Sequence, residues 1–277
     1  MLTAGQYHTL TVSRITAHGL YLADEAGDEV LLPNRFVSLC DKEGDTLDVF
    51  VYHDSENRLV ATTERPLATA GEAAYLQVVD KTIHGAFLDW GLPAKQLFLP
   101  NRNQRARLDI GQKYVVFVYT DNVTGRAVAS MFLNSFIGNA ELTVEPHQEV
   151  DILVAQETEQ GFRVVVDNRH WGMIYRNQIF RPVAVGDRMK AYVSRITDDR
   201  RIDLSLQRQG YDEVKVSAER LLGLLRENGG AMALGDDSSP DEVRRLTQMS
   251  KKTFKRSIGY LMKQGLVAMD EQGIRLK

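Results

Sequence analysis

The hydrophobic residues along most of the chain fall in short runs that alternate with polar positions. Residues 48–52 and 75–79 follow this period of two and are rich in valine, tyrosine and other β-forming residues. Such a pattern is typical of half-buried β-strands. Turn-forming sequences separate the runs, for example at residues 25–28 and 121–125. The pattern therefore predicts short strands joined by tight turns up to about residue 210.

The strand pattern is repeated. HGLYL at residues 18–22 returns as HGAFL at 84–88, and LPNR at 32–35 returns as LPNR at 99–102. A third, more diverged copy carries QGFRV at residues 160–164 and ends in the segment RRIDLS. A repeat of this length marks a repeated structural unit, so we expect three copies of one domain.

Each copy holds about five predicted strands in roughly 65 residues, which suits a small Greek-key barrel of the oligonucleotide-binding (OB) type. Closing the sheet into a barrel also removes its free edges. We expect the three barrels at residues 1–65, 66–138 and 146–208.

From residue 211 the hydrophobic period becomes helical. Ser239, Pro240 and Glu242 form a strong helix start, with an N-cap serine, a proline at the first helical position and a glutamate placed to complete a capping box. Ser250 begins a further helix, and a hairpin is expected over residues 266–276. The predicted inward-facing residues are Leu221, Leu222, Leu224 and Leu225 in the first helix and Phe254, Ile258, Leu261 and Met262 in the last.

Three helices followed by a hairpin are the outline of a winged helix, expected over residues 211–277. The predicted fold class is therefore mostly β with a C-terminal α+β domain. Three tandem five-stranded OB-fold barrels are followed by a winged helix-turn-helix.

Composition and charge narrow the class of protein. The formal net charge is −3, but residues 1–210 hold 22 basic against 27 acidic residues, whereas residues 211–277 hold 12 against 10. The C-terminal part carries a net positive charge and is thus better suited to bind the negatively charged phosphates of a nucleic acid. The single cysteine, Cys40, allows no intrachain disulfide, and no apolar run approaches the roughly 20 residues that cross a bilayer. With no secretion signal in the first residues, we expect a cytoplasmic protein without membrane contact.

Aromatic residues of the barrels are candidate RNA contacts, because single strands are held by stacking their bases on aromatic faces. Alternation in HGAFLD points Ala86 and Leu88 inward and leaves Phe87 outward, beside His84. His18 and Tyr21 repeat this arrangement in the first copy. The alternative interpretation is that a neighbouring domain covers these side chains.

Three arginines recur at matched positions before the last strand of each copy, namely Arg58, Arg126 and Arg201. A guanidinium binds phosphate through two hydrogen bonds or stacks on a base. We take them as further candidate RNA contacts, with a surface ion pair as the alternative.

The predicted last helix carries a basic stripe without acidic residues. A recognition helix places its N-terminal half in a groove, where these side chains would meet phosphates or base edges. The alternative is a solvated helix face in a protein-binding domain. The candidate residues are Lys251, Lys252, Lys255, Arg256 and Lys263, with Arg275 and Lys277 on the wing.

Sequence motifs of catalysis are missing. No Walker loop, HExxH or Gly-x-Ser-x-Gly occurs, and Asn34 with Arg35 lacks a nucleophile or base at defined spacing. We expect no enzymatic activity, no metal site and no cofactor.

The barrels resemble the S1 RNA-binding domain through HGAFLDWG at residues 84–91 and RRIDLS at 200–205. The order of the domains, the duplicated LPNR and the segment SKKTFKRSIGYLMKQGLV resemble the conserved virulence factor B family over essentially the whole chain. The resemblance implies RNA binding linked to regulation of gene expression. It also implies a role near the ligand for Tyr175, where S1 domains often carry a histidine. The third copy departs from the pattern, with Gln160 and Arg163 at the positions of His84 and Phe87.

The expected function is that of a non-enzymatic regulator of bacterial gene expression that binds single-stranded RNA with its barrels and its basic winged helix. One alternative is a transcriptional regulator that binds duplex DNA through the winged helix. Another is a protein adaptor on ribosomes or RNA-processing complexes.

Overall fold

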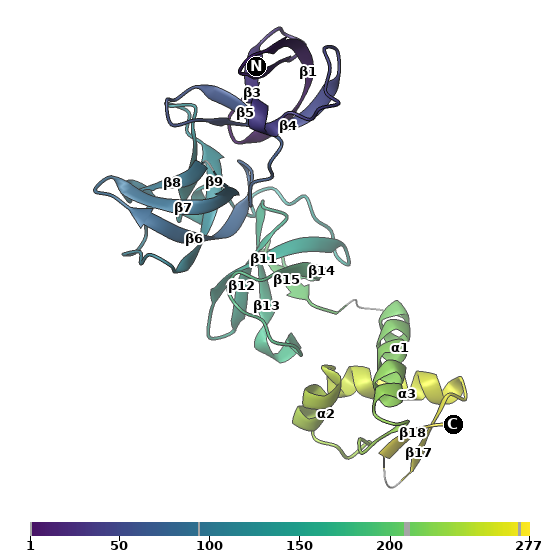
Figure 1. The fold of residues 1–277 in the computed structure, drawn as a ribbon. Helices are drawn as coiled ribbons and strands as arrows, with labels where there is room; N and C mark the ends of the chain where they lie inside the picture. The colour runs from purple at the N-terminus through teal and green to yellow at the C-terminus, as the bar shows by residue number, and fades with distance from the viewer. Residues whose placement is uncertain (1, 94, 208–210, 271–272) are drawn as a thin grey trace. The chain divides into compact units, whose positions relative to one another are not determined.

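Three closed barrels of five strands precede a helical region with a small sheet, as the sequence predicts (Figure 1). The computed structural model describes residues 2–93, 95–207, 211–270 and 273–277. The chain divides into two compact units, Met1–Gly138 and Asn139–Lys277. The first unit holds two barrels, and the second holds the third barrel and the helical region.

The three barrels share one topology. In the first, the strands close in the order β1-β2-β3-β5-β4, and β3 and β5 are the parallel pair. The second and third barrels repeat this order and this parallel pair. The strands of the first barrel are β1 (Gln6–Thr16), β2 (Gly19–Ala23), β3 (Glu29–Pro33), β4 (Thr46–His53) and β5 (Leu59–Thr62). Those of the second are β6 (Ala73–Lys81), β7 (Gly85–Leu92), β8 (Lys95–Pro100), β9 (Lys113–Thr120) and β10 (Ala127–Ser130). Those of the third are β11 (Glu149–Glu157), β12 (Gly161–Val166), β13 (His170–Tyr175), β14 (Arg188–Ile196) and β15 (Ile202–Ser205).

The repeated HG and LPNR motifs make the same contacts between neighbouring strands in the first two barrels. A Cβ atom on Gly85 would collide with the backbone oxygen of Leu99, because β7 and β8 approach closely there. Asn101, the asparagine of LPNR, donates its backbone N–H to the carbonyl of His84 (3.0 Å) and its side-chain N–H to that of Ile83 (2.7 Å). Asn34 makes the matching bonds in the first barrel. The motif is thus a structural clamp between neighbouring strands.

The first two barrels share a hydrophobic core. Phe50, Tyr52 and Val60 of the first barrel belong to the cluster that fills the second. The rings of Phe50 and Trp90 meet edge to face with centroids 5.3 Å apart, and the Trp90 indole N–H donates to the carbonyl of Ala68 (2.8 Å). Buried aromatic contacts of this kind join the two barrels into one packed body.

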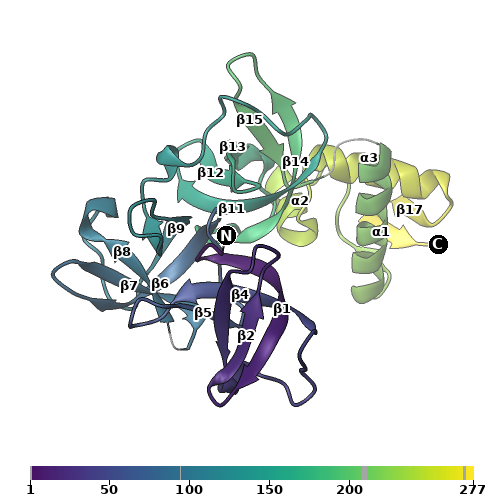
Figure 2. The same ribbon diagram turned by 90° about the horizontal axis from the view of Figure 1, so that it is seen from above.

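The C-terminal region is a winged helix. Ser239 caps α2 through a complete capping box, and Ser250 caps α3, so both predicted helix starts are confirmed. Two details differ from the sequence prediction: β16 adds a third strand to the hairpin, and Met262 lies 48% exposed on the outer side of α3. The elements are α1 (Tyr211–Glu227), β16 (Ala231–Met232), α2 (Pro240–Thr247), α3 (Lys251–Lys263), β17 (Val267–Asp270) and β18 (Gly273–Leu276). Figure 2 shows α1, α2, α3 and β17.

The strand β16 has only two residues, and a strand this short shows no recognisable alternation of hydrophobic and polar positions in the sequence. The prediction that Met262 is buried was wrong. Its spacing of four residues from Ile258 fits an apolar helix face, but the buried face of α3 includes Ile258 and Leu261 and not Met262.

Within the described residues, no helix combines the length and apolar character needed to cross a membrane.

Candidate nucleic-acid interface

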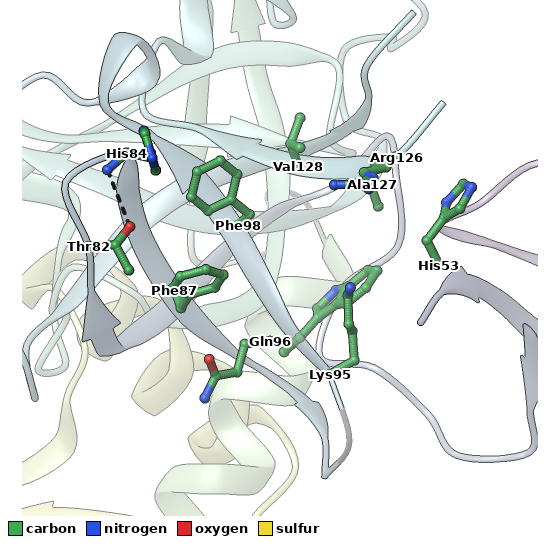
Figure 3. Close-up of a pocket in the computed structure, with 11 residues that line it drawn as sticks. His53, Thr82, His84, Phe87, Lys95, Gln96, Phe98, Arg126, Ala127 and Val128 are labelled. Atoms are coloured by element: carbon green, nitrogen blue, oxygen red, sulfur yellow. Dashed lines mark hydrogen bonds between the residues drawn. The ribbon is translucent and has the colours of Figure 1, made fainter. Parts of the chain in front are cut away.

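The second barrel presents a pair of half-buried aromatic rings that face a hollow. Phe87 on β7 and Phe98 on β8 lie opposite each other across the antiparallel pair, with ring centroids 5.2 Å apart. Ala86 and Leu88 are fully buried on the other face of β7, which confirms the predicted alternation. The two rings line a hollow of about 360 Å³. Figure 3 shows both side chains among the residues that line it.

Polar side chains lie at both ends of this hollow. His84 and Thr82 are at one end, and Lys95, Arg126 and His53 are at the other (Figure 3). None of the described residues that line it is acidic. The hollow thus combines an aromatic floor with a positive end, which are the two features that hold a single-stranded nucleic acid.

The positive end is held by the turn between β4 and β5 of the first barrel. Lys95 donates its ammonium N–H to the carbonyl of Asp54 (3.4 Å), and the Arg126 Nε–H donates to the side-chain oxygen of Asn57 (2.6 Å). Burial lowers the pKa of Lys95, and the nearby Arg126 guanidinium lowers that pKa further. Burial likewise lowers the pKa of His53, with Arg126 and Lys95 acting in the same direction. Burial is the main cause of both pKa shifts, the neighbouring positive charges add to it, and the Asp54 carboxylate acts in the opposite direction.

The matching face of the first barrel is covered. Tyr21 lies on β2 as predicted, but the Arg14 guanidinium stacks on its ring at 3.9 Å and is held there by Glu29 (2.8 Å). The residue opposite Tyr21 on β3 is Leu31 rather than an aromatic residue. His18 is exposed at the start of this face. The first barrel therefore lacks the open ring pair of the second.

The three matched arginines differ in their partners. Each immediately precedes the fifth strand of its barrel, as the repeat predicts. Arg126 lines the hollow of the second barrel. Arg58 instead forms ion pairs with Asp54 (2.8 Å) and Glu56 (2.9 Å), and Arg201 forms one with Asp199 (2.7 Å). These exposed pairs are weak, so the two side chains stay available to a stronger anion.

The third barrel places its aromatic residues on a different strand. Trp171, Met173 and Tyr175 alternate along one half-buried side of β13. The Arg163 guanidinium stacks on the Trp171 ring at 3.6 Å, and the Tyr175 hydroxyl donates to Asp203 (3.2 Å). These side chains and Arg201 line a hollow of about 320 Å³. Tyr175 and Arg201, two separate candidate RNA contacts, therefore lie in the same hollow.

The predicted basic residues of the winged helix lie on α3 and on the wing. Lys252, Arg256 and Lys263 are exposed along one side of α3, and Lys251 is half-buried at its start. Lys255 pairs with Asp236 (3.3 Å), and on β18 Arg275 pairs with Asp270 (3.3 Å). The exposed stripe of α3 is suited to contacts with backbone phosphates. In the part of the chain that the structure describes, no group of three or more His, Cys, Asp or Glu residues is arranged to hold a metal ion.

Comparison with known proteins agrees with this arrangement. The family model of the S1 domain matches residues 4–64 and 70–131, and that of the CvfB-like winged helix domain matches residues 219–276. The Bacillus subtilis (strain 168) protein YitL is 30% identical over 273 residues, which is 95% of this chain and 90% of that protein. The chain belongs to the conserved virulence factor B family. Conserved virulence factor B of Staphylococcus saprophyticus is 21% identical over 248 residues, covering 84% of this chain and 80% of that protein.

A solved structure from Streptococcus pneumoniae TIGR4 is described as a multidomain protein with nucleic acid binding domains. It is 22% identical, covers 99% of this chain and 98% of that chain, and has a TM-score of 0.43. Within this member of the conserved virulence factor B family, the S1 family model matches the two barrels of the first unit.

Several side chains of these faces were not found from the sequence. Phe98 was missed because its counterpart in the first copy is Leu31, so the repeat comparison gave no signal. His53 and Lys95 were missed because they meet only where two barrels pack together. Trp171 was missed because its register partner on β12 is Val165, and it meets Arg163 only diagonally across the strand pair.

Proposed function

We propose that this protein is a non-enzymatic, cytoplasmic RNA-binding regulator of bacterial gene expression that acts on single-stranded RNA. The observation that carries the proposal is the open Phe87–Phe98 pair beside Lys95 and Arg126. A base stacked on an aromatic side chain contributes about 1 to 3 kcal/mol whatever its identity. The positive end of the hollow supplies the contact to the phosphate backbone.

The three barrels have different shares in this binding. The second barrel is the principal site, because its two rings face a hollow. The third contributes through Trp171 and Tyr175, while the first contributes less because Arg14 occupies the face of Tyr21. Modules joined in one chain raise one another's effective concentration, so modest individual affinities add up to tight binding.

The winged helix adds contacts to phosphates through α3. Its exposed Lys252, Arg256 and Lys263 carry positive charge that no acidic residue of α3 offsets. Such contacts are independent of base sequence and weaken as salt is raised.

Fluorescence anisotropy tests the proposal with labelled single-stranded RNA, single-stranded DNA and duplex DNA, measured over a salt series. We expect RNA to bind most tightly, and we expect the Phe87→Ala/Phe98→Ala variant to lose roughly tenfold or more in affinity, because two stacking surfaces are removed. Phe132→Ala removes a part-exposed aromatic residue outside the hollow and is the matched control. Its affinity should equal that of the wild type.

Two results would contradict the proposal. Duplex DNA bound most tightly and unaffected by the Phe87→Ala/Phe98→Ala change would assign the function to the winged helix. Binding to none of the probes would favour a protein adaptor.

A further inference from the structure

One side of the second barrel's hollow is built by the first barrel. His53, the last residue of β4, lines the hollow that contains Phe87 and Phe98. The following turn contacts the second barrel twice, where Lys95 bonds to Asp54 and Arg126 bonds to Asn57. The positive end of the hollow is therefore shared between two barrels.

This shared end has positive charge without a matching carboxylate. Among the described residues, no carboxylate oxygen lies within 4.0 Å of the Lys95 ammonium or the Arg126 guanidinium; each donates to a neutral oxygen instead. The Asp54 carboxylate is already bound by Arg58 through two hydrogen bonds (3.0 and 2.8 Å). Lys95 is half-buried and Arg126 is exposed. Like charges close to each other repel, and an anion placed between them would relieve that repulsion.

His53 adds an unused hydrogen-bonding atom to the same place. Its Nδ1 is buried and has no hydrogen-bond partner in the described part of the chain. A buried polar atom without a partner is costly, unless a ligand or water satisfies it.

We infer that His53, Lys95 and Arg126 form a phosphate subsite shared between the first two barrels, which receives the backbone phosphate of the nucleotide whose base stacks on Phe87 and Phe98. This inference rests on the proposed function, because it assigns the positive end of the same hollow. It adds a residue of the first barrel, His53, to the binding site of the second.

The subsite makes RNA binding depend on pH. The charged groups that act on His53 are Arg126 and Lys95, which lower its pKa together with burial, and Asp54, which raises it. A bound phosphate adds negative charge, so the pKa of His53 is higher in the complex than in the free protein. Binding then takes up a proton, and affinity rises as pH falls between these two pKa values, by at most about tenfold per pH unit.

The first test is RNA affinity between about pH 7.5 and pH 6, the range in which histidines titrate. We expect wild-type affinity to rise about threefold or more as the pH falls, and most of that gain to disappear in His53→Gln. His8→Gln, a change at a half-buried histidine of β1 outside the hollow, should keep the wild-type profile. His84 is unchanged in all three proteins, so the comparison isolates the contribution of His53.

A second test asks about the anion without RNA. Sulfate, whose charge is constant in this pH range, is added to the full chain while the ring signals of its histidines are followed by NMR. We expect sulfate to raise the pKa of His53, and we expect Lys95→Met to abolish this rise. Lys113→Met, at an exposed lysine of β9 outside the hollow, should leave it unchanged.

The outcomes separate the two proposals. If Phe87→Ala/Phe98→Ala weakens RNA binding but His53→Gln keeps the pH profile and sulfate leaves His53 unmoved, the subsite is overturned and the proposed function stands. If no RNA binds, the proposed function fails, and the sulfate titration alone decides for or against an anion subsite.

Discussion

At the scale of single residues, the three barrels differ in what lies on their aromatic side chains. Phe87 and Phe98 are open, whereas Tyr21 lies under Arg14 and Trp171 lies under Arg163. A stacked guanidinium competes with a base for the same ring face. Barrels of the same topology therefore differ in how well their aromatic side chains can stack on a base. The difference comes from side chains that are not repeated between the copies.

The strand clamp is testable at Gly85. The change Gly85→Ala places a methyl group against the Leu99 carbonyl, so we expect the unfolding free energy of the first unit to fall by about 2 kcal/mol or more. Thermal or urea unfolding measures this loss. Gly138→Ala is the control, since a Cβ atom there meets no other atom within 4 Å. Equal stability of both variants would show that β7 and β8 can separate without cost.

At the scale of elements, the sequence predicted most of the architecture. The repeated HG and LPNR segments predicted that one barrel unit recurs along the chain, and the Ser239 capping box predicted the start of α2. These signals are local, because a glycine or a cap acts on its own backbone. Phe98, His53 and Lys95 could not be found in this way, because their roles arise from pairing between strands or barrels that are distant in sequence.

The basic stripe of α3 gives a separate prediction. Charge reversal in Lys252→Glu/Arg256→Glu should weaken RNA binding at low salt and reduce the slope of log affinity against log salt by roughly 0.7 to 0.9 for each phosphate that the variant no longer neutralises. Anisotropy over a salt series measures the slope. Arg226→Glu changes an exposed charge on α1 and should leave the slope near that of the wild type. An unchanged slope in the α3 variant would show that the winged helix does not touch the RNA.

At the scale of the whole molecule, the shared core makes the first two barrels one functional body. The cluster that fills the second barrel includes Phe50 and Tyr52 of the first, and the hollow of the second is completed by His53. A duplication that gave two independent barrels would have needed no such contacts. The first barrel therefore serves mainly to support the second barrel and to complete its hollow, and it need not bind RNA equally well.

Hydrogen exchange of the full chain tests this coupling. Phe50→Ala removes a fully buried ring from the shared cluster, so exchange should accelerate in the strands of both barrels, with a loss of about 3 to 5 kcal/mol in stability. Ile174→Ala, a core change in the third barrel, should accelerate exchange in that barrel without affecting the first two. Acceleration confined to the first barrel in Phe50→Ala would show that the two barrels open independently.

Photo-crosslinking locates single-stranded RNA on the protein and shows whether it lies on the face of the second barrel that carries Phe87 and Phe98. A single-stranded RNA of about ten nucleotides containing 4-thiouridine matches the length that such barrels bind. After irradiation with the full chain, the crosslinked peptides are identified by mass spectrometry. We predict crosslinks on β7 and β8, at or beside Phe87 and Phe98. Crosslinks confined to α3, or spread evenly over all surfaces, would show that the RNA does not lie on this face of the second barrel.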